Sequence, residues 1–417
     1  MNKHAHKESV LILSYYAEMP GACQAEWLDD KVDSIKKLDY KVLLVSAASC
    51  GKNNDREVTH WRAPSVSYTD YWEEVNRIKS QGRSLPTSMY WMLPIAITFG
   101  LLIDAAQYLA TKGIGEGRWS WAISATIAAI MLCVTRRPTV ILSTGGPASA
   151  HLAGIVLKRL FSIPLIVELQ DPLSGIDIGR NSHARGWLYK IESTIVDQAD
   201  KIAYVTKGAA DYATEQFATS KICSVYPGAR KFTGINSTGR HPQAKAFRMV
   251  HLGSLYATRN FKTLIMALDK LISGGKVDSS HIEIINLGHV AEDIRRDIAH
   301  LPYISILPPV SRPEALQFAA EADLLLLIQN NDDRSKVTIP YKTYDYLNLA
   351  KPILALQNSA ELANLVSNCG HFQVSVSDVN EIAEILDKLI NNKCDMNIKF
   401  GNIEAVEQAH ELLALHN

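Results

Sequence analysis

The sequence predicts an α/β protein made of two doubly wound, Rossmann-like domains that face a cleft. Short apolar runs recur along the chain with helical stretches between them, and the runs are continuous rather than alternating. Continuous apolar strands separated by helices are typical of parallel sheets covered on both faces. A polar stretch, "TGINSTGRHPQAKA" (233–246), interrupts this rhythm near the middle. The length of 417 residues also exceeds what one hydrophobic core usually supports, so two domains are expected.

The N-terminal domain is expected over residues 1–240. Its first strand is "SVLIL", whose apolar run of Val10 to Leu13 is too short for the core of a signal peptide. The following strands are "KVLLVSA" (41–47), "PTVILS" (138–143), "PLIVEL" (164–169) and "KIAYVT" (201–206).

The C-terminal domain is expected over residues 241–403. Its strands are "FRMVHLG" (247–253), "HIEIINLG" (281–288), "ADLLLLIQ" (322–329) and "KPILAL" (351–356). The last stretch, 404–417, is expected to form a helix that packs back on the N-terminal domain.

Composition argues against a polyanionic partner and against a metal site. Lys plus Arg and Asp plus Glu are equal at 43 each, so no overall positive charge attracts nucleic acid. The six cysteines are scattered without C-x-x-C or Cys/His clusters that could hold zinc, which predicts reduced packing cysteines in a cytoplasmic protein. They are Cys23, Cys50, Cys133, Cys223, Cys369 and Cys394.

Candidate site residues follow the predicted strands. Ligands of such sheets bind beyond the carboxyl ends of the strands, and the small residues found there allow close backbone approach. His151 can equally cap or pack within its helix, Asp171 can belong to a turn, and Gly21 can be a plain turn glycine. The candidates are Gly21, Gly145, Gly146, His151, Asp171, Gly253, Ser254 and Arg259.

The stretch "IPYKTYDYLNLAKPILAL" (339–356) carries a cation and an anion at a predicted helix start. Pro340 suits the first helical position, and Ile339 cannot cap with a side-chain oxygen, so the amides of Lys342 and Thr343 are expected to be free for an anion. Asp345 lies one turn after Lys342 and can accept hydrogen bonds from hydroxyl groups. Phosphate plus diol indicates a nucleotide; the alternative is a Lys–Asp pair on the wet edge of a buried helix.

These motifs together resemble the GT-B glycosyltransferases, in particular the retaining family 4 type that uses nucleotide sugars. The resemblance rests on segments in the same order as in that family. They are "STGGPASAHLAGIVLKRLFSIPLIVELQDPL", "IESTIVDQADKIAYVT", "VHLGSLYATRNFKTLIMAL", "VSRPEALQFAAEADLLLLIQ" and "IPYKTYDYLNLAKPILAL".

The resemblance implies no bound metal or other cofactor, and it implies a role for each candidate. Arg259 and Lys342 would bind the donor diphosphate, and Asp345 the ribose hydroxyls. Gly253 and Ser254 would offer the donor loop, Gly21, Gly145 and Gly146 a donor or acceptor loop, and His151 and Asp171 would be catalytic. The sequence departs from the family pattern at Asp345, at Val337, at Asn260 and in "VYPGAR". Since Val337 replaces a glutamate that usually contacts the sugar, the sugar stays open.

Two apolar stretches raise the question of a membrane. Residues 89–110 approach the length of a spanning helix but contain Pro94, Asp104 and Gln107, while 119–134 is shorter than the ~20 residues that spanning needs. The second stretch is expected to be a buried helix on the sheet. For the first, with Tyr90 and Trp91 near Lys79 and Arg83, a contact with the membrane interface and a buried insertion stay open.

The sequence therefore predicts a glycosyltransferase that moves a sugar from a nucleotide-sugar donor to a carbohydrate or lipid-linked acceptor, with retention, as in surface polysaccharide or glycoconjugate assembly. It is expected in the cytoplasm, with a peripheral position at the inner face of the membrane as the open alternative. A nucleotide-sugar epimerase of the same architecture and a non-catalytic partner subunit are the rival functions.

Overall fold

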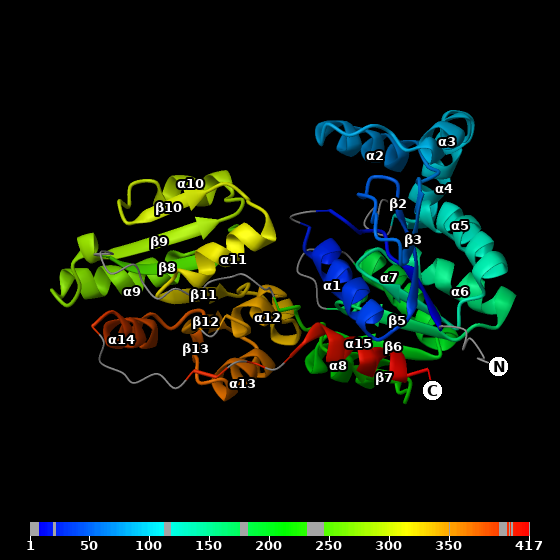
Figure 1. Cartoon of the computed structure of the whole chain (residues 1–417). Helices are drawn as coiled ribbons and strands as arrows, with labels where there is room; N and C mark the ends of the chain where they lie inside the picture. The colour runs from blue at the N-terminus through cyan, green and yellow to red at the C-terminus, as the bar shows by residue number, and fades with distance from the viewer. Residues whose placement is uncertain are drawn as a thin grey trace. The chain divides into compact units, whose positions relative to one another are not determined.

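The computed structural model describes residues 8–19, 22–111, 118–175, 182–231, 246–349, 351–391, 398–399, 401 and 403–416. The chain forms two compact units (Figure 1): unit 1 comprises Met1–Gly228 and Ala405–Asn417, and unit 2 comprises Ala229–Glu404. The division falls at 228/229 and 404/405, whereas the sequence placed it at 240/241 and 403/404. Ala229 belongs with unit 2 because its amide donates to the Ile403 carbonyl (3.2 Å). Most of the expected linker 233–246 lies outside the described residues.

Unit 1 contains a seven-stranded parallel sheet with the order β3-β2-β1-β4-β5-β6-β7. The strands predicted from the N-terminal half are confirmed as β1, β2, β4, β5 and β6, whereas β3 and β7, at the two edges, were not predicted. The strands are β1 (Ser9–Leu13), β2 (Lys41–Ala47), β3 (Val58–Ala63), β4 (Val140–Thr144), β5 (Leu165–Leu169), β6 (Lys201–Tyr204) and β7 (Ile222–Ser224).

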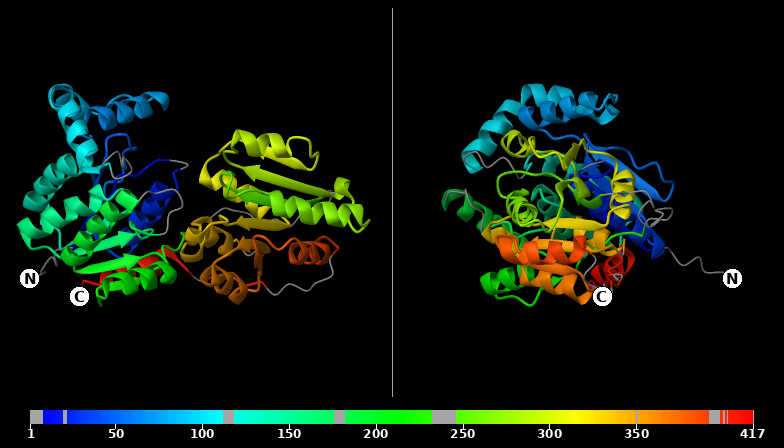
Figure 2. Two further views of the ribbon diagram at one scale, coloured as in Figure 1. Left: turned by 180° about the vertical axis from the view of Figure 1, so that it is seen from behind. Right: turned by 90° about the vertical axis from the view of Figure 1, so that its left-hand side faces the viewer.

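Helices surround this sheet and a fully buried core lies beneath them. All four apolar residues of β1 from Val10 to Leu13 have no exposed surface, as expected for the middle of a parallel sheet. The helices are α1 (Cys23–Lys37), α2 (Tyr68–Ser80), α3 (Thr87–Thr98), α4 (Gly100–Thr111), α5 (Trp121–Arg136), α6 (Ser149–Phe161), α7 (Ser182–Gln198) and α8 (Lys207–Phe217). The C-terminal helix α15 (Ala405–Ala414), red in Figure 2, packs against α1 and adds Leu412 and Leu413 to the same core.

Unit 2 contains a six-stranded parallel sheet with the order β10-β9-β8-β11-β12-β13. The predicted strands are confirmed as β8 (Phe247–Leu252), β9 (Ile282–Leu287), β11 (Leu324–Ile328) and β12 (Ile353–Gln357), while the edge strands β10 (Ile304–Leu307) and β13 (Phe372–Ser375) were missed. The α-helices are α9 (Lys262–Ser273), α10 (Glu292–Ile298), α11 (Arg312–Ala320), α12 (Lys342–Leu347), α13 (Ala360–Asn368) and α14 (Val379–Ile390). Short 3-10 helices cover Ser279–His281 and Asp333–Val337. Ser335, within the second of these, is buried.

The apolar stretch 89–110 is not one helix but two. Helices α3 and α4 are bent by 70° at a break around Phe99, and no single described helix is long and apolar enough to cross a membrane. At the break, Gly100 lies so close to α2 that a Cβ there would be 2.7 Å from the Tyr68 amide nitrogen. Both helices stand beside α2, at the end of unit 1 away from α15 (Figures 1 and 2).

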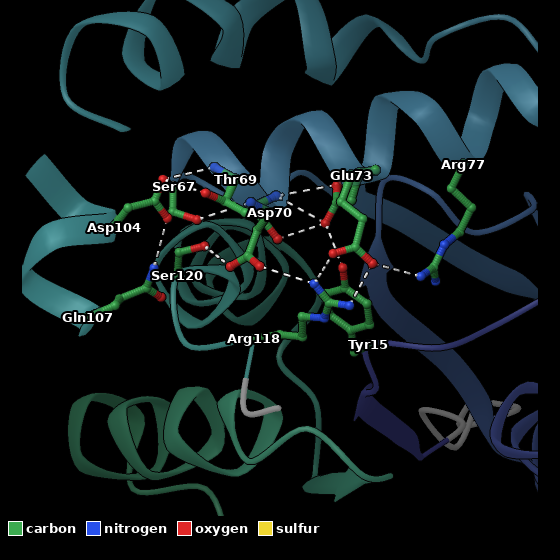
Figure 3. A network of polar contacts seen from close by, with 12 residues as sticks. Tyr15, Ser67, Thr69, Asp70, Glu73, Arg77, Asp104, Gln107, Arg118 and Ser120 are labelled. Atoms are coloured by element: carbon green, nitrogen blue, oxygen red, sulfur yellow. Dashed lines mark hydrogen bonds and ion pairs between the residues drawn. The ribbon is translucent and has the colours of Figure 1, made fainter. Parts of the chain in front are cut away.

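Polar contacts fasten this helical end of unit 1 to the sheet (Figure 3). Asp104 of α4 accepts from the Thr69 amide and from the Thr69 hydroxyl, both at 2.9 Å, and so satisfies the first turn of α2. Arg118, three residues before the start of α5, donates through both terminal nitrogens to Glu73 (2.5 and 2.7 Å) and also binds Asp70 (3.1 Å). The guanidinium carbon also lies 5.9 Å from the centre of the Tyr15 ring, which follows β1.

Helix α5 corrects a second expectation. One face of it packs on the sheet through Trp121, Ala125, Ala129 and Leu132, all of them buried. The opposite face is not covered within the described residues. It exposes apolar side chains at helical spacing: Ile123, Ile127, Met131 and Val134, which are 49–60% exposed. The expectation of a buried helix therefore holds for only one of its two faces.

Candidate functional site

The carboxyl ends of β8 and β11 form the point in unit 2 where the strand order reverses. The ladder between these strands ends at the pair Val250–Leu325, before β8 itself ends at Leu252. Two side chains of α12 bind the backbone of Leu252. The Lys342 ammonium donates to the Leu252 carbonyl (2.8 Å), and the Leu252 amide donates to the Tyr346 hydroxyl (2.9 Å). Residues four apart share one face of a helix, so Lys342 and Tyr346 lie side by side and together bind α12 to the end of β8.

The turn after β8 brings bare backbone next to the Lys342 ammonium. Gly253 has a φ of 124°, and a Cβ built on it would lie 3.6 Å from Lys342 Nζ. Gly288, after β9, has a φ of 146°, and its Cβ would lie only 2.5 Å from the Gly253 carbonyl oxygen. A side chain at Gly288 would therefore displace the Gly253 turn. Of the predicted donor residues, the structure brings Lys342, Gly253 and the adjoining Ser254 together.

Two polar residues that were not predicted lie directly behind Lys342. Its Nζ is 2.6 Å from His251 Nε2, and His251 Nδ1 is 2.7 Å from Asn286 Oδ1. His251 and Asn286 are register partners on β8 and β9, and both are fully buried. Burial, with the charges of Lys342 and Arg259, holds the pKa of His251 well below its usual range. The signal was present in the sequence as a histidine and an asparagine inside otherwise apolar strands.

Arg259 lies in the tight turn that follows Gly253. Its backbone and that of Tyr256 exchange two hydrogen bonds of 2.8 Å, and its guanidinium carbon lies 5.3 Å from the Tyr256 ring centre. Because the Arg259 charge contributes to the lowered pKa of His251, both cations act on the same imidazole. Asn260, at the position where the family often has lysine, instead accepts from the Lys262 amide at the start of α9 (2.9 Å).

The predicted helix start at Pro340 and the predicted free amide of Thr343 are both wrong. Helix α12 begins at Lys342 rather than at Pro340, and the Thr343 amide donates to the Pro340 carbonyl (2.9 Å) instead of remaining free. Asp345 is 7% exposed, and Arg312 of α11 donates to both of its carboxylate oxygens, at 2.6 and 3.2 Å. The sequence missed this bidentate pair because Arg312 lies on a different helix.

In unit 1, the reversal of strand order lies between β1 and β4. Gly145, directly after β4, has a φ of 112°, and a Cβ there would be 3.4 Å from the Ser14 hydroxyl after β1. A Cβ on Gly146 would be 3.9 Å from the Gln24 amide nitrogen of α1. The predicted glycine turn thus stands at the switch point of the sheet, between groups from β1 and α1. Gly21 lies outside the described residues.

His151 of α6 is buried inside unit 1. It has no exposed surface, its Nδ1 lies 2.9 Å from the Ser143 hydroxyl of β4, and its Nε2 has no partner among the described residues. Burial lowers its pKa to about 4, so the imidazole is neutral at pH 7. The side chain therefore points toward β4, in agreement with the packing alternative that the sequence left open.

Asp171 stands half-buried after β5, and the loop that follows it is anchored by Glu192 of α7. The buried Glu192 carboxylate accepts from the amides of Leu173 (3.0 Å) and Ser174 (2.9 Å) and from the Tyr204 hydroxyl (2.7 Å). A second buried carboxylate, Glu168 of β5, pairs with Lys31 of α1 at 2.5 Å and accepts from Thr144. Neither carboxylate belongs to a metal cluster: the described residues contain no group of three or more His, Cys, Asp or Glu side chains that could hold a metal ion.

Comparison with known families bears on unit 1. Residues 104–228 match the model of the Glycosyl transferase 4-like domain. The matched stretch lies within unit 1. It contains the Gly145–Gly146 turn, His151 and Asp171. A comparison with curated protein sequences finds no match.

Solved structures resemble the chain over nearly its full length. Anabaena HepE in complex with UDP and glucose is 14% identical, with a TM-score of 0.56, over 98% of this chain and 97% of that one. Sucrose-phosphate synthase from Thermosynechococcus elongatus is 8% identical, with a TM-score of 0.64, over 98% and 95%. The lipopolysaccharide outer core galactosyltransferase WaaB is 9% identical, with a TM-score of 0.58, over 97% and 99%. The predicted GT-B fold is confirmed.

Proposed function

We propose that the protein is a glycosyltransferase that transfers a sugar from a nucleotide-sugar donor to a carbohydrate or lipid-linked acceptor, with retention, in surface polysaccharide or glycoconjugate assembly. The observation that carries the proposal is the Lys342 ammonium held at the carboxyl end of β8, beside the bare backbone of Gly253. The glycosyl transferase 4-like domain at 104–228 supports it, as does the shared fold with HepE, whose structure contains UDP and glucose.

Sugar transfer requires positive charge next to the nucleoside diphosphate, because negative charge develops on this leaving group as it departs. Lys342 and Arg259 supply two cations at one strand end, and fixed charge at the leaving group lowers the barrier without a metal. Gly253 has no side chain to keep the phosphates away from its backbone. Retention, as the resemblance implies it, has the acceptor hydroxyl attack from the face that the leaving group vacates, so no side-chain nucleophile is required.

Nucleotide binding is the first test. A ligand that binds only the folded chain raises its melting temperature, so UDP, GDP and ADP should be compared with their nucleosides in a thermal melt. Lys342→Ala and Arg259→Ala should each raise the barrier to sugar transfer by about 2–4 kcal/mol. Lys336→Ala is the matched control, because this exposed lysine of unit 2 pairs with Asp333 on the same short helix.

The outcomes separate the candidate functions. Turnover that needs an acceptor and falls in both site variants supports glycosyl transfer. An epimer or free sugar released without acceptor favours the epimerase, and nucleotide binding without any turnover favours a non-catalytic subunit. Near-normal turnover in both Lys342→Ala and Arg259→Ala contradicts the proposed donor site.

We also propose that the protein acts in the cytoplasm, at the inner face of a membrane, and that α3 and α4 contact the bilayer where a lipid-linked acceptor resides. The polarity of α4 is inverted relative to a surface helix, which normally turns its apolar face inward. Its inward-facing residues are Gly100, Ile103, Asp104, Gln107 and Thr111, three of them polar, whereas Leu101, Leu102, Tyr108 and Leu109 are 61–77% exposed.

Helix α3 and the outer face of α5 support the same contact. Trp91, Tyr90 and Ile97 are 80%, 62% and 55% exposed, and amphipathic aromatic residues are typical of the membrane–water interface. Asp104 is satisfied by Thr69 rather than turned outward. Arg83, expected among the basic residues near the interface, instead donates to the carbonyls of Ser49 and Cys50. Exposed Arg136 at the end of α5 is a better candidate for anionic headgroups.

Flotation with liposomes tests this contact. A variant with Trp91, Ile97, Leu102 and Leu109 changed to serine should stay in the bottom fraction while the parent protein floats with the liposomes. Both should melt alike because these side chains are exposed. Met266→Ser is the control, since Met266 is a 49% exposed residue of unit 2. Unchanged flotation, or a collapsed melting temperature in the four-residue variant, contradicts the membrane contact.

A further inference from the structure

We propose that His251 and Asn286 position the ammonium group of Lys342 for the donor diphosphate. The inference rests on the proposed function and assigns to two buried residues a role in it. Neither residue needs to touch the substrate, so both are positioning residues.

The direction of each hydrogen bond follows from the chemistry of Lys342. A lysine ammonium has three donors and no acceptor, so at 2.6 Å the His251 Nε2 must accept. The imidazole proton then sits on Nδ1, which donates to Asn286 Oδ1 at 2.7 Å. The Asn286 amide nitrogen in turn faces the Gly288 carbonyl at 3.4 Å. The lowered pKa of the buried His251 is consistent with this neutral, accepting form.

These contacts fix a side chain that is otherwise mobile. Lysine carries its charge on a flexible four-carbon stem, and here the ammonium is held between His251 Nε2 and the Leu252 carbonyl. Both acceptors belong to β8, which is paired with β9 from Phe247 to Leu252. The charge is thus fixed to the sheet rather than to the short helix that carries Lys342.

The same two strands also carry the turn glycines. His251 precedes Gly253 by two residues and Asn286 precedes Gly288 by two, and the His251–Asn286 pair lies in register. A Cβ on Gly253 would be 4.0 Å from His251 Cε1. The imidazole therefore sets the distance between the ammonium and the glycine turn at which the phosphates would bind.

The alternative is that His251 and Asn286 form a purely structural polar pair. The two hypotheses predict different effects on the affinities for nucleosides and for nucleoside diphosphates. If His251 and Asn286 only satisfy each other, their loss destabilises unit 2 and weakens nucleosides and nucleoside diphosphates alike. If they position Lys342, the loss falls on the diphosphate, because only the phosphates contact the ammonium. The ratio of the two affinities is therefore the decisive readout.

The experiment compares His251→Phe, His251→Gln and Asn286→Leu with the parent protein, using calorimetric titration with UDP and uridine, or with whichever of the GDP–guanosine and ADP–adenosine pairs binds. His251→Phe and Asn286→Leu should weaken the diphosphate about tenfold and the nucleoside less than about twofold. His251→Gln retains an acceptor oxygen and should recover most of the loss. His371→Phe is the matched control, because His371 is buried in the same unit and neither ring nitrogen has a hydrogen-bond partner among the described residues.

Each result has one meaning. A parent protein that binds none of the diphosphates overturns the proposed function. A parent protein that binds a diphosphate, with the ratio unchanged in the folded His251 and Asn286 variants, overturns only the positioning role. If His251→Phe does not fold, Asn286→Leu and His251→Gln decide the question by the same ratio.

Discussion

Glu74 on α2 offers a sharp test of the electrostatics in unit 1. Its carboxylate is 2% exposed and accepts from the Tyr15 hydroxyl (3.0 Å), the Ser65 hydroxyl (2.7 Å) and the Ser65 amide (3.3 Å). All three partners donate and so favour the ionised form, yet burial outweighs them and raises the pKa of Glu74 from 4.5 to about 7.

The sign of the effect on stability follows from the direction of this shift. An acid whose pKa is higher in the folded chain holds its proton more tightly when folded, so stability falls as the pH rises from 4.5 to about 7. The whole difference corresponds to about 3 kcal/mol, of which about 2 kcal/mol should be lost between pH 5 and pH 8. His60 and His151, with pKa values lowered by burial to about 3 and about 4, act in the opposite direction.

Glu74→Gln isolates the contribution of this carboxyl because the two histidines stay in place. The chain has 7 tryptophans and all lie in unit 1, so tryptophan fluorescence during urea unfolding follows this unit alone. Between pH 5 and pH 8 the free energy of unfolding should change by about 2 kcal/mol more favourably in Glu74→Gln than in the parent protein. Equal changes in the two proteins would refute the assignment of a raised pKa to Glu74.

Three further predictions follow from buried contacts. Lys31→Met should destabilise unit 1 by about 3–5 kcal/mol in the same fluorescence assay, because it leaves the Glu168 carboxylate buried without its cation, and adding Glu168→Leu should restore much of the loss. Gly288→Ala should speed hydrogen exchange of the β8 and β9 amides, because the new Cβ would lie 2.5 Å from the Gly253 carbonyl oxygen. Gly275→Ala is the control: this glycine has a positive φ of 66° but open space around it, so the free energy of unfolding should fall by only about 1 kcal/mol. Asp345→Asn should weaken UDP more than deoxy-UDP if this carboxylate reads the ribose; equal losses in titration would leave it only its pairing with Arg312.

The sequence was sufficient for the inner strands and insufficient for the outer ones. Strands such as β1 and β11 are buried on both faces and therefore appear as continuous apolar runs. The missed strands β3, β7, β10 and β13 are the edges of the two sheets. An edge strand is covered less, so it is short and mixed in character, as in β10, none of whose residues is fully buried.

The candidate site divides in the same way. Gly253 was predictable because it directly follows the apolar run of β8, and Lys342 because the segment 339–356 resembles the donor segment of the family. The partners of these residues were not, since His251 and Asn286 come together only through the register of β8 with β9, and Arg312 reaches Asp345 from another helix. The family pattern implied that Asp345 binds the ribose hydroxyls, but it did not indicate that Arg312 pairs with this carboxylate.

Helix α4 shows why composition alone left the membrane question open. Its polar residues Asp104, Gln107 and Thr111 recur at helical spacing, which in an ordinary amphipathic helix marks the solvent face. The structure turns this stripe inward because α2 offers Thr69 to Asp104 and the bare Gly100 allows the close approach that the contact requires. The outward face is then apolar by elimination, and an exposed apolar surface of several helices is costly in water. An apolar environment outside α4 removes that cost, so the proposed bilayer contact follows from the direction of the polar stripe rather than from the number of apolar residues.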